Sequence, residues 1–345
     1  MKLLDDLKYI HSKDSKDAFG FALKQPSQLL VDFSLGQLNG RVDHVVFAGA
    51  GRSTLWAEIA QIWPKCKVPF EIWRDYSGPA YLGRNSLVII NSYSGDTEEP
   101  LSAMKEAETA RAQIIVVSNG GPMMDRASEK GHPFIKLPDT LQPRLSTLSG
   151  LKTLVAILDR AGLAKENIPE TLNKTEQFLS SEMSNWTPQT PTKNNPAKQL
   201  ALEIAGTTPI IYAGRHLYPA AYKWKIAFNE VAKNLAWSGK IPESSHSEFS
   251  GWTSHPVDKP FSIIDLRGSF DHPQVSKRFD LSSKLLSGKR PHSQTVTAKG
   301  GGELNQLLYM TMLGEYVALY TAMLNGVDPS ELSYVPKLKQ GLLDD

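Results

Sequence analysis

Three hydroxyl side chains stand close together in one short polar segment of the sequence, Ser92-Tyr93-Ser94-Gly95-Asp96-Thr97. The segment lies between an apolar run and an expected helix, where free backbone N–H groups favour an anion. There the hydroxyls of Ser92, Ser94 and Thr97 can each donate to a phosphate oxygen. Gly95 allows the loop to curl round the ligand. The segment therefore predicts a site for a small phosphate.

The same segment also fits an ordinary helix cap, with Asp96 as the capping residue and Glu99 completing a capping box. Position alone favours that alternative, because hydroxyls near helix starts are usually caps. The number of hydroxyls and the adjacent glycine favour the ligand site. The segment has no P-loop lysine, which favours a sugar phosphate over a nucleoside triphosphate.

A second turn of this kind occurs earlier in the chain, at Gly49-Ala50-Gly51-Arg52-Ser53-Thr54. It follows an apolar run and opens an expected helix, so it can also present N–H groups to an anion. A dinucleotide-binding fingerprint would have a third Gly or Ala where this sequence has Thr54, so the match is incomplete. Glu71 could still take the place of the acid that binds the ribose in such sites. A purely structural turn remains the alternative.

The elements that would position these turns are short apolar runs alternating with helical stretches. Continuous apolar runs bounded by Gly, Asn and Ser are typical of strands buried on both faces, and their alternation with helices predicts parallel α/β sheets. The alternation resumes in the second half, which suggests a structural repeat. The predicted strands are residues 44–48, 68–73, 86–90, 113–117, 133–137, 209–214 and 261–265.

Length and composition are those of an ordinary two-domain globular protein. The chain has 345 residues, and its 38 basic and 36 acidic side chains give a formal net charge of +2. This balance argues against nucleic acid or an anionic membrane as the main partner. The lone Cys66 cannot form an intrachain disulfide, and no signal peptide or long apolar segment is evident. We therefore expect a cytoplasmic protein.

The domain boundaries are predicted from a change in composition. Residues 185–196 hold three prolines and several small polar residues, which is typical of a linker. We expect a first domain with leading helices at 1–160, a helix and proline-rich linker at 161–196, and a second domain with closing helices at 197–345.

Several segments together resemble the bifunctional phosphoglucose/phosphomannose isomerases, a family built from two sugar-isomerase (SIS) domains. The resemblance is ordered along nearly the whole chain. The matching segments are residues 49–53, 92–99, 142–144, 228–233, 241–252, 313–316, 326–329 and 338–339. It implies two SIS domains, each a mostly parallel, doubly wound, flavodoxin-like sheet flanked by helices.

The resemblance also implies a role for particular residues. Glu230 matches the base that moves a proton between C1 and C2, and Arg144 matches the cation that stabilises the enediolate. His246 and Lys339 match the pair that opens the sugar ring, and in the family this histidine comes from the partner subunit, which implies an obligate homodimer. Without the resemblance, each of the four would be an ordinary surface or helix-end residue.

The phosphate would then lie between Gly51 and Ser53 on one side and the hydroxyls of Ser92, Ser94 and Thr97 on the other. The implied reaction interconverts fructose 6-phosphate with glucose 6-phosphate, mannose 6-phosphate or both, without a cofactor or a metal. Two alternatives stay open: a non-catalytic sugar-phosphate-binding regulator, and an amino-sugar phosphate deaminase or deglycase. Serines around His246 replace amide side chains of the family, so the preferred epimer stays open.

Overall fold

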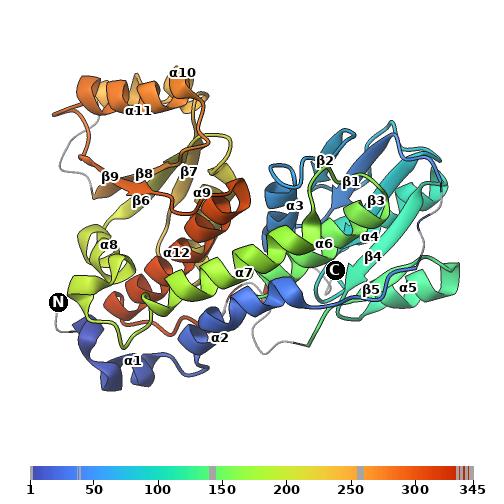
Figure 1. Cartoon of the computed structure of the whole chain (residues 1–345), viewed down its shortest axis with the longest axis horizontal. Helices are drawn as coiled ribbons and strands as arrows, with labels where there is room; N and C mark the ends of the chain where they lie inside the picture. Colours follow the sequence, from blue (N-terminus) through green and yellow to red (C-terminus); the bar gives the residue numbers. More distant parts are fainter. Residues whose placement is uncertain are drawn as a thin grey trace. The chain divides into compact units, whose positions relative to one another are not determined.

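The computed structural model describes residues 3–36, 38, 40–139, 145–254, 260–331, 334, 337, 338 and 341. The chain forms two compact units, each built on its own parallel β-sheet (Figure 1). The sheet A unit comprises Lys24–Gln177, and the sheet B unit comprises Met1–Leu23 together with Phe178–Asp345. The predicted α/β fold class is confirmed.

Sheet A has five strands in the order β2-β1-β3-β4-β5, and every neighbouring pair is parallel. All five coincide with predicted apolar runs. Every residue of β3 is buried, as expected for a strand covered on both faces. The order, with β1 between β2 and β3, is the doubly wound arrangement that was predicted. The strands are β1 (His44–Ala48), β2 (Phe70–Trp73), β3 (Ser86–Asn91), β4 (Gln113–Ser118) and β5 (Phe134–Lys136).

Alternate residues of β1 pack against different layers of helices. Val46 joins the core cluster formed with α4 and α5. Its neighbour Phe47 meets the ring of Trp56 on α3 edge-on, and Trp56 in turn lies directly over Gly150 of α6. Sheet A is therefore the middle layer of a three-layer unit. Its helices are α3 (Leu55–Ala60), α4 (Glu98–Thr109), α5 (Pro122–Lys130), α6 (Thr147–Arg160) and the first part of α7 (Ile168–Ser184).

Sheet B has four parallel strands in the order β7-β6-β8-β9. This is the order of the first four strands of sheet A, with β6 in the place of β1, so the suggested repeat exists in the topology. β6 and β8 were predicted, whereas the two edge strands were not. The strands are β6 (Thr208–Ala213), β7 (Trp237–Lys240), β8 (Phe261–Arg267) and β9 (Ser293–Thr297).

A single long helix, α12, forms the core of the sheet B unit. By length and composition it is the one helix among the described residues that could cross a membrane, but 94% of its most apolar window is buried inside the protein. It packs mainly against α8 and α9. The helices of this unit are α1 (Leu7–Lys13), α2 (Ala18–Lys24), α8 (Pro196–Ile204), α9 (Tyr218–Glu230), α10 (Ser244–Ser247), α11 (Pro273–Leu285) and α12 (Glu303–Leu324).

The N-terminal segment groups with sheet B, although the sequence placed it with the first domain. The hydroxyl of Tyr9 donates to the carbonyl of Met323 at 2.7 Å, and Ser15 donates to Asp328 at 2.5 Å. The proline-rich stretch at 185–196 is also packed, since Trp186 is buried against the rings of two tyrosines of α12. The observed division therefore falls inside α7, between residues 177 and 178.

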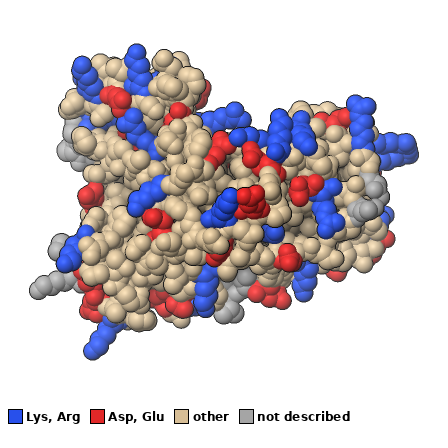
Figure 2. All heavy atoms as spheres, viewed as in Figure 1, with Lys and Arg blue, Asp and Glu red and all other residues tan. Residues whose placement is uncertain are grey.

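Charged side chains of both signs are interspersed on the face shown in Figure 2. This distribution fits the nearly balanced composition of the chain. A single-sign surface, which would favour a polyanionic partner, is absent from this face.

Candidate functional site

The two predicted anion turns lie side by side at the carboxyl edge of sheet A. β1 and β3 are neighbours with Ala48 opposite Ile90, so the turns that follow them leave the sheet at the same place. The side-chain amide of Asn91 donates to the carbonyl of Ser53 at 3.0 Å and ties the two turns together. Gly51 has a φ of +54° with open space around its Cα, so the first turn depends on a glycine there.

The hydroxyls of the second turn are linked to one another. The oxygens of Ser92 and Thr97 are 2.8 Å apart, those of Ser92 and Ser94 are 3.5 Å apart, and the backbone N–H of Gly95 donates to Ser92 at 3.1 Å. Ser92 is buried, whereas Ser94 is exposed and donates to Asp96. The structure thus brings the three predicted hydroxyls together. We call them the hydroxyl cradle (Ser92, Ser94 and Thr97).

Helix α4 begins at this cradle without a side-chain cap. Thr97 is the N-cap residue, and its side chain caps no backbone N–H of the helix. The capping box expected from Asp96 and Glu99 as an alternative is therefore not what starts the helix. The N-terminus of a helix carries a partial positive charge, which favours a bound anion beside the cradle.

A third turn, after β4, closes tightly on the cradle. A Cβ on Gly95 would lie 1.8 Å from the carbonyl oxygen of Gly120, and a Cβ on Gly121 would lie 2.4 Å from that of Ser94. Both glycines also have positive φ values, of +75° and +77°. The N–H of Met123 donates to the carbonyl of Gly95 at 3.0 Å. The cradle therefore rests on a backbone contact that only glycine permits.

The corresponding edge of sheet B is filled by the protein's own side chains. Gly214 follows β6, as Gly49 follows β1, but the carboxylate of Asp271 would lie 2.5 Å from a Cβ on Gly214. Asp271 accepts from the N–H of Gly268 at 2.8 Å, and Gln306 accepts from the N–H of Ser269 at 3.0 Å. The Asp271 carboxylate already occupies the place that an anion would take at this edge of sheet B. We therefore place the candidate phosphate site at the edge of sheet A alone.

Glu230 and His246 lie at opposite ends of sheet B. α9 starts beyond the carboxyl end of β6 and returns to the start of β7, so its last residue, Glu230, is near the amino ends of the strands. His246 lies in α10, beyond the carboxyl end of β7. The 13 residues of α9 alone span about 20 Å. One chain therefore does not bring these two candidates together.

The surroundings of the two residues differ. The ammonium of Lys233 donates to the backbone carbonyls of Glu230 at 2.9 Å and of Asp328 at 3.0 Å, which joins the end of α9 to the loop after α12. The ring of His246 is exposed, and among the described residues it has no hydrogen-bond partner. The other two candidates, Arg144 and Lys339, lie outside the described residues.

Comparison with known proteins gives the family. Residues 193–342 match the family model of the bacterial phospho-glucose isomerase C-terminal SIS domain. A bifunctional phosphoglucose/phosphomannose isomerase from Caldicellulosiruptor bescii is 31% identical over 307 residues, which cover 88% of this chain and 90% of the relative. The chain belongs to the bifunctional phosphoglucose/phosphomannose isomerase family. It is thus a member of a family of sugar-phosphate isomerases, as the resemblance predicted.

Other relatives of this isomerase-family member are more distant. A D-glucosamine-6-phosphate 4-epimerase from Sulfolobus acidocaldarius is 27% identical over 301 residues, covering 86% of the chain and 89% of the relative. The crystal structure of a glucose-6-phosphate isomerase like protein from Thermus thermophilus superposes with a TM-score of 0.65 at 20% identity, over 98% of each chain. This second likeness concerns the fold, which is that of the phosphosugar isomerases.

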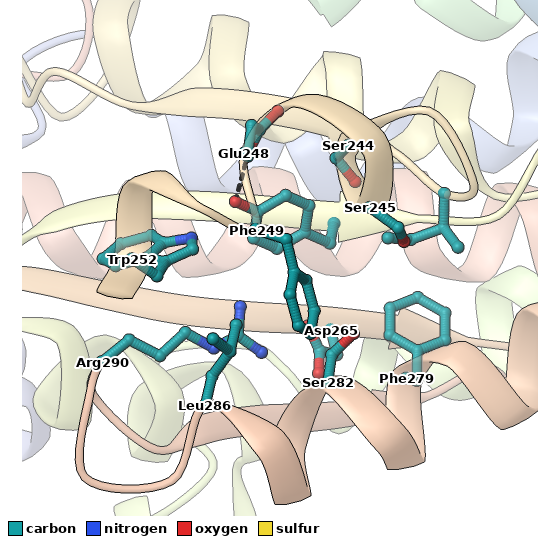
Figure 3. Close-up of a pocket in the computed structure, with 12 residues that line it drawn as sticks. Ser244, Ser245, Glu248, Phe249, Trp252, Asp265, Phe279, Ser282, Leu286 and Arg290 are labelled. Atoms are coloured by element: carbon teal, nitrogen blue, oxygen red, sulfur yellow. Dashed lines mark hydrogen bonds between the residues drawn. The ribbon is translucent and has the colours of Figure 1, made fainter. Parts of the chain in front are cut away.

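Sequence reasoning missed a small pocket beneath α10 of this isomerase-family member (Figure 3). Its cavity is about 20 Å³, room for about one water molecule. Tyr212 of β6 lines this pocket and donates a hydrogen bond to Glu248. Glu248 stands in a segment that the sequence singled out, but nothing in the sequence pairs it with a tyrosine 36 residues earlier.

Among the described residues, no group of three or more His, Cys, Asp or Glu side chains could hold a metal ion.

Proposed function

We propose that the protein interconverts fructose 6-phosphate with glucose 6-phosphate, mannose 6-phosphate or both, through a cis-enediol intermediate. The hydroxyl cradle at the uncapped start of α4 carries this proposal, in a chain whose family is named for the reaction. The cradle suits a phosphate monoester because it offers hydroxyl and backbone donors without a lysine.

Glu230 is the proposed base. Its carboxylate removes the proton on C2 of the open-chain aldose, and electrons move from that C–H bond to form the C1–C2 double bond of the enediolate. The same proton returns to C1, while a proton moves between the oxygens on C1 and C2, which completes the ketose. Arg144 holds a permanent positive charge and stabilises the enediolate oxygen. No oxidant or cofactor is needed, since the reaction only relocates two protons.

His246 and Lys339 are the proposed ring-opening pair, with His246 supplied by a second copy of the chain. Support for this arrangement comes from the positions of Glu230 and His246, which lie at opposite ends of sheet B in one chain. The exposed imidazole ring is available to a neighbouring subunit, and histidine is a common general acid and base in enzymes. A cytoplasmic homodimer therefore fits the proposal.

Coupled assays with each aldose phosphate test the reaction. We expect turnover of at least one aldose phosphate, and we expect Glu230→Gln to lower kcat by about 10²–10⁴-fold. Glu203→Gln is the matched control, because Glu203 is an exposed acid in the last turn of another helix, α8. Absence of turnover with both aldoses, or full activity in Glu230→Gln, would show that the proposed mechanism is wrong.

Mixing two variants of reduced activity tests the shared site. Randomly mixed Glu230→Gln and His246→Ala subunits should regain up to about a quarter of the activity, because half of the dimers then hold one intact site out of two. If the mixture gains no activity after exchange of subunits between dimers has been verified, Glu230 and His246 act in a site within one chain.

A second candidate function is 4-epimerisation of an amino-sugar phosphate. It is favoured by the relative that is named for that reaction and covers 86% of this chain. The phosphate cradle would serve either reaction, so the cradle does not separate them. Incubation with glucosamine 6-phosphate, followed by NMR of the sugar ring, would separate them. A change of configuration at C4 without aldose–ketose turnover would favour the epimerase.

A further inference from the structure

We propose that Tyr212 and Glu248 form a positioning pair, whose hydrogen bond fixes the inner face of α10 and thereby presents His246 to the substrate. This inference rests on the proposed role of His246 and assigns Tyr212 as a positioning residue for ring opening. It concerns residues that belong neither to the hydroxyl cradle nor to the proposed proton-transfer set.

The short helix α10 has distinct inner and outer faces. Ser244 is buried and Ser245 half-buried, and both line the pocket together with Glu248 just beyond the helix (Figure 3). His246 and Ser247 are exposed and do not line the pocket. A helix of four residues has little stability of its own, so contacts of its inner face must hold it in place.

Tyr212 supplies the contact that is directional. Its side chain is only 4% exposed, and its hydroxyl donates to the Glu248 carboxylate. Burial and this carboxylate raise the pKa of Tyr212 far above its ordinary value, so the hydroxyl stays protonated and remains a donor. A hydrogen bond to a charged acceptor is worth more than one between neutral groups.

Gly239 makes room for this bond. A Cβ on Gly239 of β7 would lie 2.5 Å from the Tyr212 ring, so the tyrosine can extend beneath β7 only because this position has no side chain. The same Cβ would lie 3.4 Å from a carboxylate oxygen of Glu248. Strand β7 leads directly into the segment that carries α10, so the pair fixes α10 close to the end of the strand.

Arg290 also packs against the tyrosine ring. Its guanidinium lies over the rings of Tyr212 and Trp252, 5.8 Å and 6.0 Å from their centroids, and it donates to the hydroxyl of Ser293 at 3.1 Å. Figure 3 shows Arg290 and Trp252 on the same side of the pocket, both below Glu248 in this view. Rings packed against a cation in a nearly filled pocket allow little movement of the hydroxyl.

A double-mutant cycle separates positioning from general stability. We expect Tyr212→Phe to lower kcat by about tenfold or more with KM within about twofold, since a small misplacement of a catalytic group costs much rate. In the His246→Ala background, which still turns over through spontaneous ring opening, Tyr212→Phe should change kcat by less than about twofold. Exchange between the α and β anomers of glucose 6-phosphate, measured by NMR, should slow in parallel with kcat.

Tyr9→Phe is the matched control, because it removes a tyrosine hydroxyl that donates to a carbonyl elsewhere in the same unit. It should lower the melting temperature without changing kcat in either background. If Tyr212→Phe does not fold, Glu248→Leu replaces it in the same cycle, and Glu248→Gln, which keeps an acceptor, should restore most of the activity.

The outcomes also separate this inference from the proposed function. If His246→Ala keeps full activity, the proposed role of His246 is wrong and the positioning role falls with it. If His246→Ala loses activity while Tyr212→Phe has the same effect in both backgrounds, or no effect in either, only the positioning role is overturned.

Discussion

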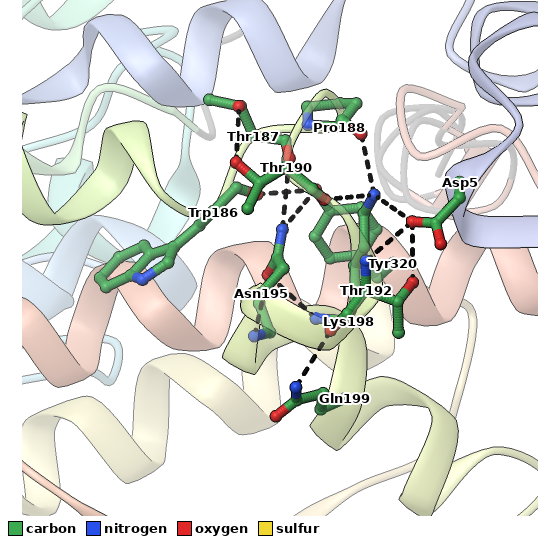
Figure 4. A network of polar contacts seen from close by, with 11 residues as sticks. Asp5, Trp186, Thr187, Pro188, Thr190, Thr192, Asn195, Lys198, Gln199 and Tyr320 are labelled. Carbon is green, nitrogen blue, oxygen red and sulfur yellow. Dashed lines mark hydrogen bonds and ion pairs between the residues drawn. The ribbon is translucent and has the colours of Figure 1, made fainter. Parts of the chain in front are cut away.

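The ammonium of Lys198 lies 3.0 Å from the carboxylate of Asp5, which precedes it by 193 residues (Figure 4). The same ammonium donates to the backbone carbonyls of Pro188 and Thr190, both at 2.8 Å. Lys198 is fully buried, so these three acceptors replace its water shell. One side chain therefore joins the start of the chain to the turn before α8 within the sheet B unit.

Replacing Asp5 should destabilise the protein in a pH-dependent way. Burial acts to raise the Asp5 pKa, but hydrogen bonds from Lys198 and Thr192 outweigh it, so the pKa lies below its usual value. The stabilisation is therefore present above the unfolded-state pKa near 3.8 and is lost as the pH falls through the folded-state value. Asp5→Asn should lower the free energy of unfolding by about 1 kcal/mol at pH 7 and by little in strong acid.

Urea unfolding followed by tryptophan fluorescence at several pH values measures this difference. Asp32→Asn is the control, because Asp32 is an exposed acid with no hydrogen bond or ion pair to the described part of the chain. A constant difference between Asp5→Asn and the wild type across the acid range would show that the ion pair does not contribute.

The central strands could be predicted from the sequence, but the edge strands of sheet B could not. Buried strands such as β3 and β8 read as continuous apolar runs because both of their faces are covered. β7 and β9 lie at the two edges of sheet B, and most of their residues are exposed or half-buried. Their segments, Trp237–Lys240 and Ser293–Thr297, therefore lack a continuous apolar run. Their pairing depends on neighbours far away in the chain.

The candidate site, like the strands, could be predicted only in part from the sequence. The hydroxyl cradle is local in sequence, so composition and helix position were enough to find it. The placement of Asp5 beside Lys198, and of Tyr212 beside Glu248, depends on how distant segments pack, which no local pattern encodes. For the same reason the sequence alone did not show that Glu230 and His246 lie at opposite ends of sheet B.

Replacing Gly95 with alanine should disrupt the cradle. Gly95 and Gly131 have similar positive φ values, +75° and +70°, but only Gly95 faces backbone, because a Cβ there would lie 1.8 Å from the Gly120 oxygen. Gly131→Ala should therefore cost about 1–2 kcal/mol from backbone strain alone. Gly95→Ala should cost about 1–3 kcal/mol more, because the backbone must also move apart.

Chemical unfolding of the two variants checks this prediction, and the affinity for a phosphorylated inhibitor gives a second readout. Only Gly95→Ala should bind the inhibitor more weakly. Equal unfolding free energies for the two variants would mean that the close contact between residues 95 and 120 is not maintained in solution.

Removing the Thr97 hydroxyl should weaken phosphate binding. Thr97→Val is nearly isosteric but cannot donate, so kcat/KM for fructose 6-phosphate should fall by about tenfold or more, the value of a hydrogen bond to a charged group. Thr97→Ser should retain most of the activity. Thr109→Val at the other end of α4, where the hydroxyl donates only to the carbonyl of Lys105, should have no effect on kinetics. Unchanged kinetics in Thr97→Val would remove this residue from the phosphate site.

The buried ion pair between Lys223 of α9 and Glu315 of α12 should be replaceable only as a pair. Both side chains are almost completely buried between the two helices. Lys223→Met leaves an uncompensated carboxylate in the core and should cost about 3–5 kcal/mol, whereas Lys223→Met combined with Glu315→Met should be near neutral or stabilising. Lys223 precedes Glu230 by about two helical turns, so the double variant should also keep its isomerase activity. Thermal unfolding of both single variants and the double variant measures the coupling, and additive losses of stability would show that the two charges do not interact.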